Sequence, residues 1–129
     1  MSEKINWTLN VQVVGGPKMS ASQTVTVDAY DKIQLTVDAG AQDKEVEVQP
    51  GPEGRVQFLL ISSDQFGDDL TYKVNDATGD AIKLDAQQLL IGDGAVGLLG
   101  ASPPETLSFT NHLPQNVNIE VLVGRNATA

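Results

Sequence analysis

The stretch Ile5-Asn6-Trp7-Thr8-Leu9-Asn10-Val11-Gln12-Val13 decides the fold class of this chain. Apolar residues occupy every odd position from 5 to 13, and uncharged polar residues occupy the even positions between them. Successive side chains of a β-strand point to opposite faces, so this alternation predicts a strand with one buried and one solvated face. Gly15-Gly16-Pro17 then ends the pattern, as expected for a turn.

The same two-residue alternation recurs at residues 24–29, 32–37, 45–49, 70–74, 106–110 and 117–123. Residues 55–61 become apolar on both faces, which predicts a central strand covered on both sides, and residues 81–84 are expected to complete a hairpin with 70–74. Turn signals separate these segments, and the strongest is Pro50-Gly51-Pro52-Glu53-Gly54. About eight strands at intervals of roughly 8–12 residues are typical of an all-β sandwich or barrel. We therefore predict one antiparallel β-sandwich domain over residues 1–129, of jelly-roll or immunoglobulin-like type, with flexible ends at 1–4 and 125–129.

Helical signal is nearly absent. Only residues 85–91 have any, because Asp85 could cap the short run Ala86-Gln87-Gln88-Leu89. We expect at most one short helical turn near residues 85–91.

Composition and charge exclude several classes of partner. The 129 residues include 17 acidic and 8 basic ones, for a net charge of −9, and no cysteine. The lysines and arginines are spread along the chain rather than clustered, which argues against binding to nucleic acid. No apolar run approaches the roughly 18 residues that a membrane span needs, and the first residues do not resemble a signal peptide. We expect no nucleic-acid or membrane partner, and either synthesis in the cytoplasm or incorporation into a particle.

The inventory of reactive residues argues against an enzyme. His112 is the only histidine, and it stands in the predicted turn Thr110-Asn111-His112-Leu113-Pro114, a poor place for the base of a buried triad. Gly92 to Gly97 contains the spacing GxGxxG, but Pro103 and Pro104 follow too soon for the helix that a phosphate site requires. We predict no catalytic and no cofactor-binding residues.

Acidic residues in neighbouring loops give one candidate metal site. Calcium prefers clusters of oxygen ligands, which carboxylates and backbone carbonyls supply. The candidate ligands are Asp64, Asp68, Asp69, Asp76 and Asp80. Aspartate is also a common turn residue, so the same pattern is compatible with loops that bind no metal.

An apolar segment interrupted by glycines gives a candidate interface. Leu90, Val96, Leu98 and Leu99 lie in the stretch 89–99, which does not alternate well and ends before two prolines. One interpretation is a hydrophobic loop that packs on another subunit. The other is a crossover that covers the core of its own chain.

Two functions from different classes remain open. The first is a non-enzymatic structural protein that self-associates, or decorates a larger particle of virion or cell-surface type, as a homo-oligomer or part of a larger assembly. The alternative is a calcium-supported module that binds carbohydrate or peptide, with Phe66 and Tyr72 beside the acidic loops. The first accounts better for the missing catalytic residues, and fold alone does not decide between them.

Overall fold

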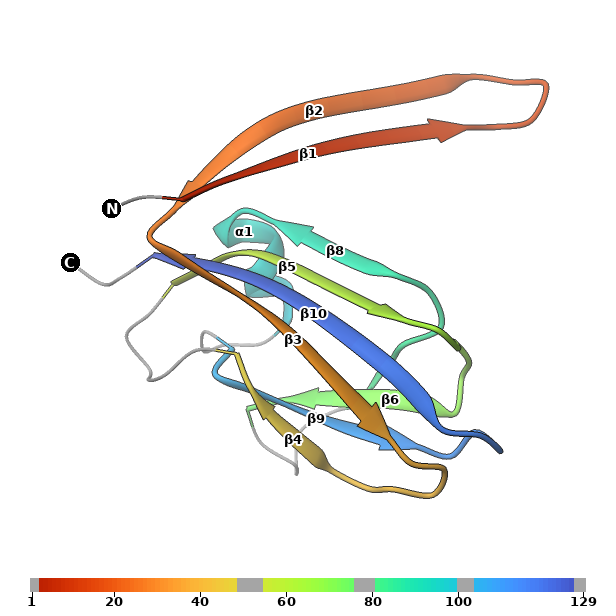
Figure 1. Cartoon of the computed structure of the whole chain (residues 1–129). Helices are drawn as coiled ribbons and strands as arrows, with labels where there is room; N and C mark the ends of the chain where they lie inside the picture. Colours follow the sequence, from red (N-terminus) through yellow and green to blue (C-terminus); the bar gives the residue numbers. More distant parts are fainter. Residues whose placement is uncertain (1–2, 49–54, 76–80, 100–103, 127–129) are drawn as a thin grey trace.

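The computed structural model describes residues 3–48, 55–75, 81–99 and 104–126 (Figure 1). In these residues the chain forms ten strands and one short helical segment. The elements are β1 (Glu3–Gln12), β2 (Lys18–Val27), β3 (Ala29–Val37), β4 (Lys44–Glu47), β5 (Arg55–Ser63), β6 (Leu70–Val74), β7 (Ile82–Lys83), β8 (Gln88–Ile91), α1 (Asp93–Val96), the 3-10 turn η1 (Gly97–Leu99), β9 (Thr106–Asn111) and β10 (Val117–Asn126).

Eight of the strands form two antiparallel sheets that pack face to face. The sheets have the orders β3-β10-β5-β8 and β4-β9-β6-β7. The pairs are nested: β3 pairs with β10, β4 with β9, β5 with β8 and β6 with β7. Such nesting is what a long antiparallel hairpin gives when it is rolled into two sheets, and it is the strand order of a jelly roll. The predicted all-β sandwich is confirmed, and of the two types named above the jelly roll is the one observed.

The core lies between these two sheets. On β10, every second residue is fully buried, namely Val117, Ile119, Val121 and Val123. The facing sheet contributes large side chains, among them Tyr72 and Phe109, whose ring centroids are 5.7 Å apart. The alternation read from the sequence therefore places one side of each strand in a continuous core.

A buried hydroxyl group links the two sheets. The hydroxyl of Tyr72 on β6 donates a hydrogen bond to Oε1 of Gln88 on β8, whose Nε2 in turn donates to the carbonyl of Lys83 at 2.7 Å. Burial raises the pKa of Tyr72 from 10.0 to about 12. Because the folded pKa is the higher one, this residue stabilises the fold fully below about pH 10 and stops doing so as the pH rises through about 12.

The helical turn lies just beyond the range predicted for it. Gln88–Ile91 forms β8 instead, pairing with residues 58–61 of β5. Gly92 then takes a positive φ of 92° and ends the strand, and helix α1 begins at Asp93. Pairing with an apolar strand has overridden the weak local helix signal. Parts of the two ends that were expected to be flexible form strands, since residues 3–4 lie in β1 and residues 125–126 in β10.

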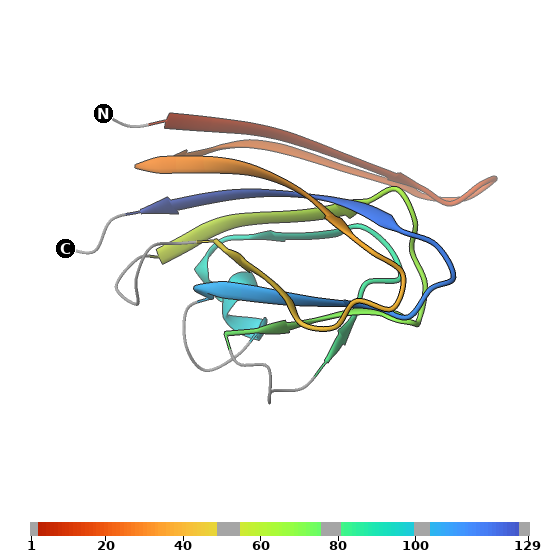
Figure 2. The ribbon, with the colours of Figure 1, turned by 60° about the horizontal axis from the view of Figure 1, so that its bottom comes forward.

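The first two strands form a separate hairpin, residues 3–27, outside the sandwich. Among the described residues, β1 and β2 pair only with each other, in a two-stranded sheet with ten residue pairs. Figures 1 and 2 show this hairpin as a third layer along the sheet β3-β10-β5-β8. One residue, Asp28, connects β2 to β3, so the hairpin and the sandwich share nearly continuous backbone.

Candidate functional site

The hairpin has one apolar and one polar face. Residues directly opposite each other in an antiparallel pair lie on the same face. One face therefore carries Ile5, Trp7, Leu9 and Val11 from β1 and Met19, Ala21, Val25 and Val27 from β2, with Glu3 and Gln23 as its polar members. The polar face pairs Asn6 with Thr24, Thr8 with Ser22 and Asn10 with Ser20. One of these pairs is hydrogen bonded, since the hydroxyl of Thr24 donates to Oδ1 of Asn6 at 2.7 Å.

The base of the hairpin packs on the outer face of the β3-β10-β5-β8 sheet. A Cβ atom at Gly124 of β10 would lie 2.7 Å from Cδ1 of Ile5 and 3.2 Å from Cγ1 of Val27, so only glycine allows this close approach. Phe58, the partner of Gly124 on β5, shares this face. Val27 and Phe58 are buried although neither belongs to the core cluster between the sheets. The base of the hairpin and the outer sheet face thus form a small second core.

Toward its turn the apolar face becomes exposed. Val27 is fully buried and Ile5 and Trp7 are partly buried, whereas Leu9 is 44%, Val11 49% and Met19 75% exposed. The turn itself adds Val14, which is 98% exposed. A contiguous exposed apolar strip of this kind is a common sign of a protein interaction site.

On the outer face of the β3-β10-β5-β8 sheet, a further row of apolar side chains runs across three strands. Leu122, Leu60 and Leu89 are aligned across β10, β5 and β8, and Leu89 is 38% exposed. The next row is polar, beginning with Glu120 and Ser62.

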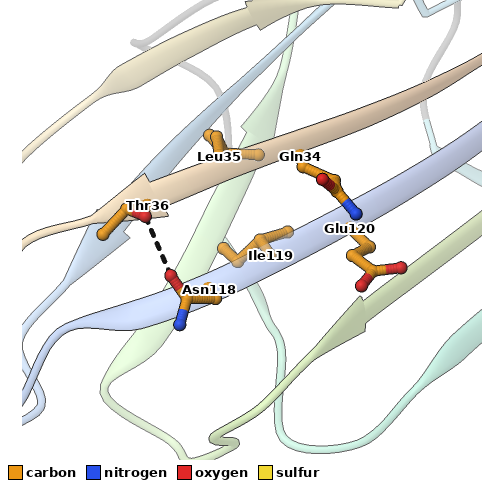
Figure 3. A pocket seen from close by; sticks show the side chains of 6 residues that line it. All are labelled: Gln34, Leu35, Thr36, Asn118, Ile119 and Glu120. Carbon is orange, nitrogen blue, oxygen red and sulfur yellow. Dashed lines mark hydrogen bonds between the residues drawn. The ribbon is translucent and has the colours of Figure 1, made fainter.

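A shallow pocket of about 360 Å³ lies farther along β3 and β10, as Figure 3 shows. Its lining residues are Gln34, Leu35, Thr36, Asn118, Ile119 and Glu120. Several polar groups there already have partners: the Thr36 hydroxyl donates to Oδ1 of Asn118 at 2.8 Å, and Glu120 lies 3.6 Å from Lys32, which is outside the lining. The lining includes no aromatic residue on which a sugar ring could stack.

The structure places the predicted calcium ligands as follows. Asp64 accepts hydrogen bonds from the backbone N–H and the Nδ2 of Asn118, at 2.9 and 3.0 Å. Asp68 and Asp69 are exposed in the loop before β6, and Asp76 and Asp80 lie outside the described residues. Within the described ranges, no group of three or more acidic or histidine side chains is arranged to hold a metal ion. The five-residue calcium site stays a prediction.

The predicted interface residues divide between the core and the surface. Val96 is 4% exposed and belongs to the core cluster, and Leu90 and Leu99 pack against that cluster. Leu98 differs, being 82% exposed. Three of the four residues therefore cover the core of their own chain, as the second interpretation of this segment expected.

The other singled-out side chains occupy contrasting positions. Tyr72 is fully buried, so it has no ring surface to offer a ligand, while Phe66 is 37% exposed. His112 is exposed, and its backbone N–H donates to the carbonyl of Asp69 at 2.9 Å. No helix in the described part of the chain is long and apolar enough to cross a membrane.

The alternation at residues 5–13 predicts a strand with one face in the core, and it does not distinguish the hairpin from the strands of the sandwich. A signal was available: residues 18–23, which pair with this strand, are Lys-Met-Ser-Ala-Ser-Gln and contain little that a core could use.

Comparison with known proteins gives no relative. No protein-family model, no curated protein and no solved structure matches this chain. The proposal below therefore rests on the geometry of the hairpin and the sandwich.

Proposed function

We propose that this protein is a non-enzymatic structural subunit that self-associates within a larger protein assembly, such as the shell or surface of a particle. The hairpin of residues 3–27 is the element through which it associates. The observation that carries the proposal is the exposed apolar strip of Leu9, Val11 and Met19.

The remaining structure is compatible with this role. The jelly-roll order is shared by viral capsid proteins, lectins and cupins, so the fold permits an assembly role without requiring it. The hairpin provides what the fold alone does not, because it has an apolar surface that the described residues of the sandwich cover at its base and leave exposed toward its turn. A surface of this kind is stabilised when a second protein covers it.

The free energy that the apolar strip contributes to self-association can be estimated from the side chains that it would bury. Covering the exposed parts of Leu9, Val11 and Met19 contributes about 1 kcal/mol for each side chain. A contact with two-fold symmetry counts each residue twice, which gives about 6 kcal/mol. Association costs roughly 4–15 kcal/mol in lost freedom, so this strip gives weak self-association unless further contacts add to it.

The test is a triple substitution on the apolar strip, Leu9→Ser, Val11→Ser and Met19→Ser. A matched control changes Thr8, Asn10 and Ser20 to alanine, at neighbouring positions of the same strands but on the polar face. Sedimentation velocity from low micromolar to millimolar concentration should show the wild type and the control growing in mass, and the apolar-strip variant staying monomeric. Equal melting temperatures would show that the sandwich stays folded. A wild type that remains monomeric throughout, or an apolar-strip variant that assembles normally, would contradict the proposal.

A further inference from the structure

Hydrogen-bonded and non-hydrogen-bonded residue pairs alternate along the hairpin, and their order shows which backbone groups of β1 face outward. The N–H of Val13 donates to the carbonyl of Pro17 at 2.9 Å, which makes residues 13 and 17 a hydrogen-bonded pair. Hydrogen-bonded and non-hydrogen-bonded pairs alternate along an antiparallel ladder. Odd residues of β1 therefore bond to β2, and the N–H and C=O groups of Asn6, Thr8, Asn10 and Gln12 point toward the free edge.

This free edge lacks the features that normally prevent strand pairing. Proteins protect exposed edges with charged residues, prolines or bulges. Residues 5–14 contain no charge, no proline and no glycine, and the β1–β2 register runs without a shift over its ten pairs. β1 thus offers a long regular edge to another strand.

Charge disfavours a contact between the sandwiches of two copies. Residues 1–27 contain Glu3, Lys4 and Lys18 as their charged residues, a net charge of +1. Since the whole chain carries −9, residues 28–129 carry −10. Two copies that meet through their sandwiches would bring these negative charges together, whereas two copies that meet through their hairpins would not.

Side-chain size favours β1 over β2 as the pairing edge. A two-fold axis places two copies of one strand antiparallel, so either edge of the hairpin can pair with its own copy. Pairing through β1 would bring Trp7, Leu9 and Val11 of both copies next to each other on one face. Pairing through β2 would place Ala21 and Gln23 at the centre of the contact instead.

We propose that β1 of one copy pairs antiparallel with β1 of a second copy, which gives a four-stranded sheet in the order β2-β1-β1-β2. This inference rests on the proposed self-association and assigns its geometry. Because the N–H and C=O groups of the even-numbered residues point toward the free edge, even-numbered residues of one copy form hydrogen-bonded pairs with even-numbered residues of the other. The apolar faces of both hairpins then lie on the same side of the joined sheet.

The first test uses proline at two opposed positions, in Thr8→Pro and Ser22→Pro. Thr8 and Ser22 are cross-strand partners, and in both the N–H points away from the hairpin, so neither change removes a hydrogen bond within it. Thr8→Pro should raise the dissociation constant of the dimer about tenfold or more, and Ser22→Pro should leave it unchanged. Equal effects of the two variants, or a larger effect of Ser22→Pro, would overturn the inference.

The second test uses the wild-type chain, so misfolding caused by a proline substitution cannot affect its result. Amide hydrogen exchange of the wild type is compared at low and high protein concentration. The amides of Asn6, Thr8 and Asn10 should gain protection as the dimer forms, and those of Ser20, Ser22 and Thr24 should not. If mass grows with concentration but these β1 amides stay unprotected, the edge pairing is wrong while self-association stands. If mass does not grow at all, both fail.

Discussion

The sandwich and the N-terminal hairpin are built from the same alternating pattern but use it differently. In the sandwich, the apolar side of each strand meets the apolar side of a facing sheet, and residues such as Phe109 and Ile119 are fully buried. In the hairpin, the apolar side packs on the sandwich at its base, where Ile5 and Val27 approach Gly124, and the exposure increases toward the turn. Alternation therefore identifies a strand with one apolar face, but it does not identify what covers that face.

The sandwich and the hairpin should differ most in how much free energy of unfolding is lost when an apolar side chain is truncated. Phe109→Ala removes a fully buried ring that packs against Tyr72, and we expect a loss of about 3–5 kcal/mol in the free energy of unfolding. Val14→Ala, at a 98% exposed position of the hairpin turn, should change it by less than about 0.5 kcal/mol. Urea unfolding followed by circular dichroism measures both. Similar losses from the two variants would mean that the hairpin belongs to the core after all.

A smaller effect is expected where the two regions touch. Gly124→Val should cost about 1–3 kcal/mol, because its side chain would need the space that Ile5 and Val27 occupy. The fluorescence of Trp7, the only tryptophan, should report a displaced hairpin. Adding Ile5→Ala to Gly124→Val should recover part of the loss, since it removes the atom in closest contact. An unchanged spectrum together with unchanged stability would show that the hairpin base is not packed as described.

The smallest effect concerns the middle of the hairpin. Nε1 of Trp7 is buried without a hydrogen-bond partner in the described part of the chain. An unsatisfied buried donor costs about 1–3 kcal/mol, which offsets much of what the larger ring gains by packing. Trp7→Phe should therefore change the free energy of unfolding by less than about 1 kcal/mol, whereas Trp7→Ala should cost more because it also removes the ring. Thermal melts monitored by circular dichroism compare the two. A large loss in Trp7→Phe would imply that the indole N–H has a partner.

Much of the sandwich could be predicted from the sequence, because its strands alternate and its turns contain glycine, proline and aspartate. Residues 117–123 show this well, since every second residue is apolar and fully buried. The strand Gln88–Ile91 was missed because its three consecutive apolar residues do not alternate, and its partner on β5 is 27 or more residues away in the chain. Pairing over that distance leaves no local pattern.

The candidate site was harder to predict for the same reason. The four leucine and valine residues proposed as an interface lie near one another in sequence, but three of them meet the core of their own chain. Leu9, Val11 and Met19 were either assigned to the core or overlooked, because exposure depends on what lies opposite a strand in space. The two ends of the hairpin's apolar face, at Val27 and Val11, have similar residues and opposite environments.

The single-residue connection at Asp28 has a mechanical consequence. Its N–H donates to the carbonyl of Arg125 at 3.0 Å and to Oδ1 of Asn126 at 3.1 Å, which anchors the junction to β10. A pull on β2 by a neighbouring molecule would therefore reach the sandwich through this one junction, beside the nine residue pairs that join β3 to β10. A subunit held by its hairpin would transmit tension from its neighbour into its own sandwich at the first residues of β3.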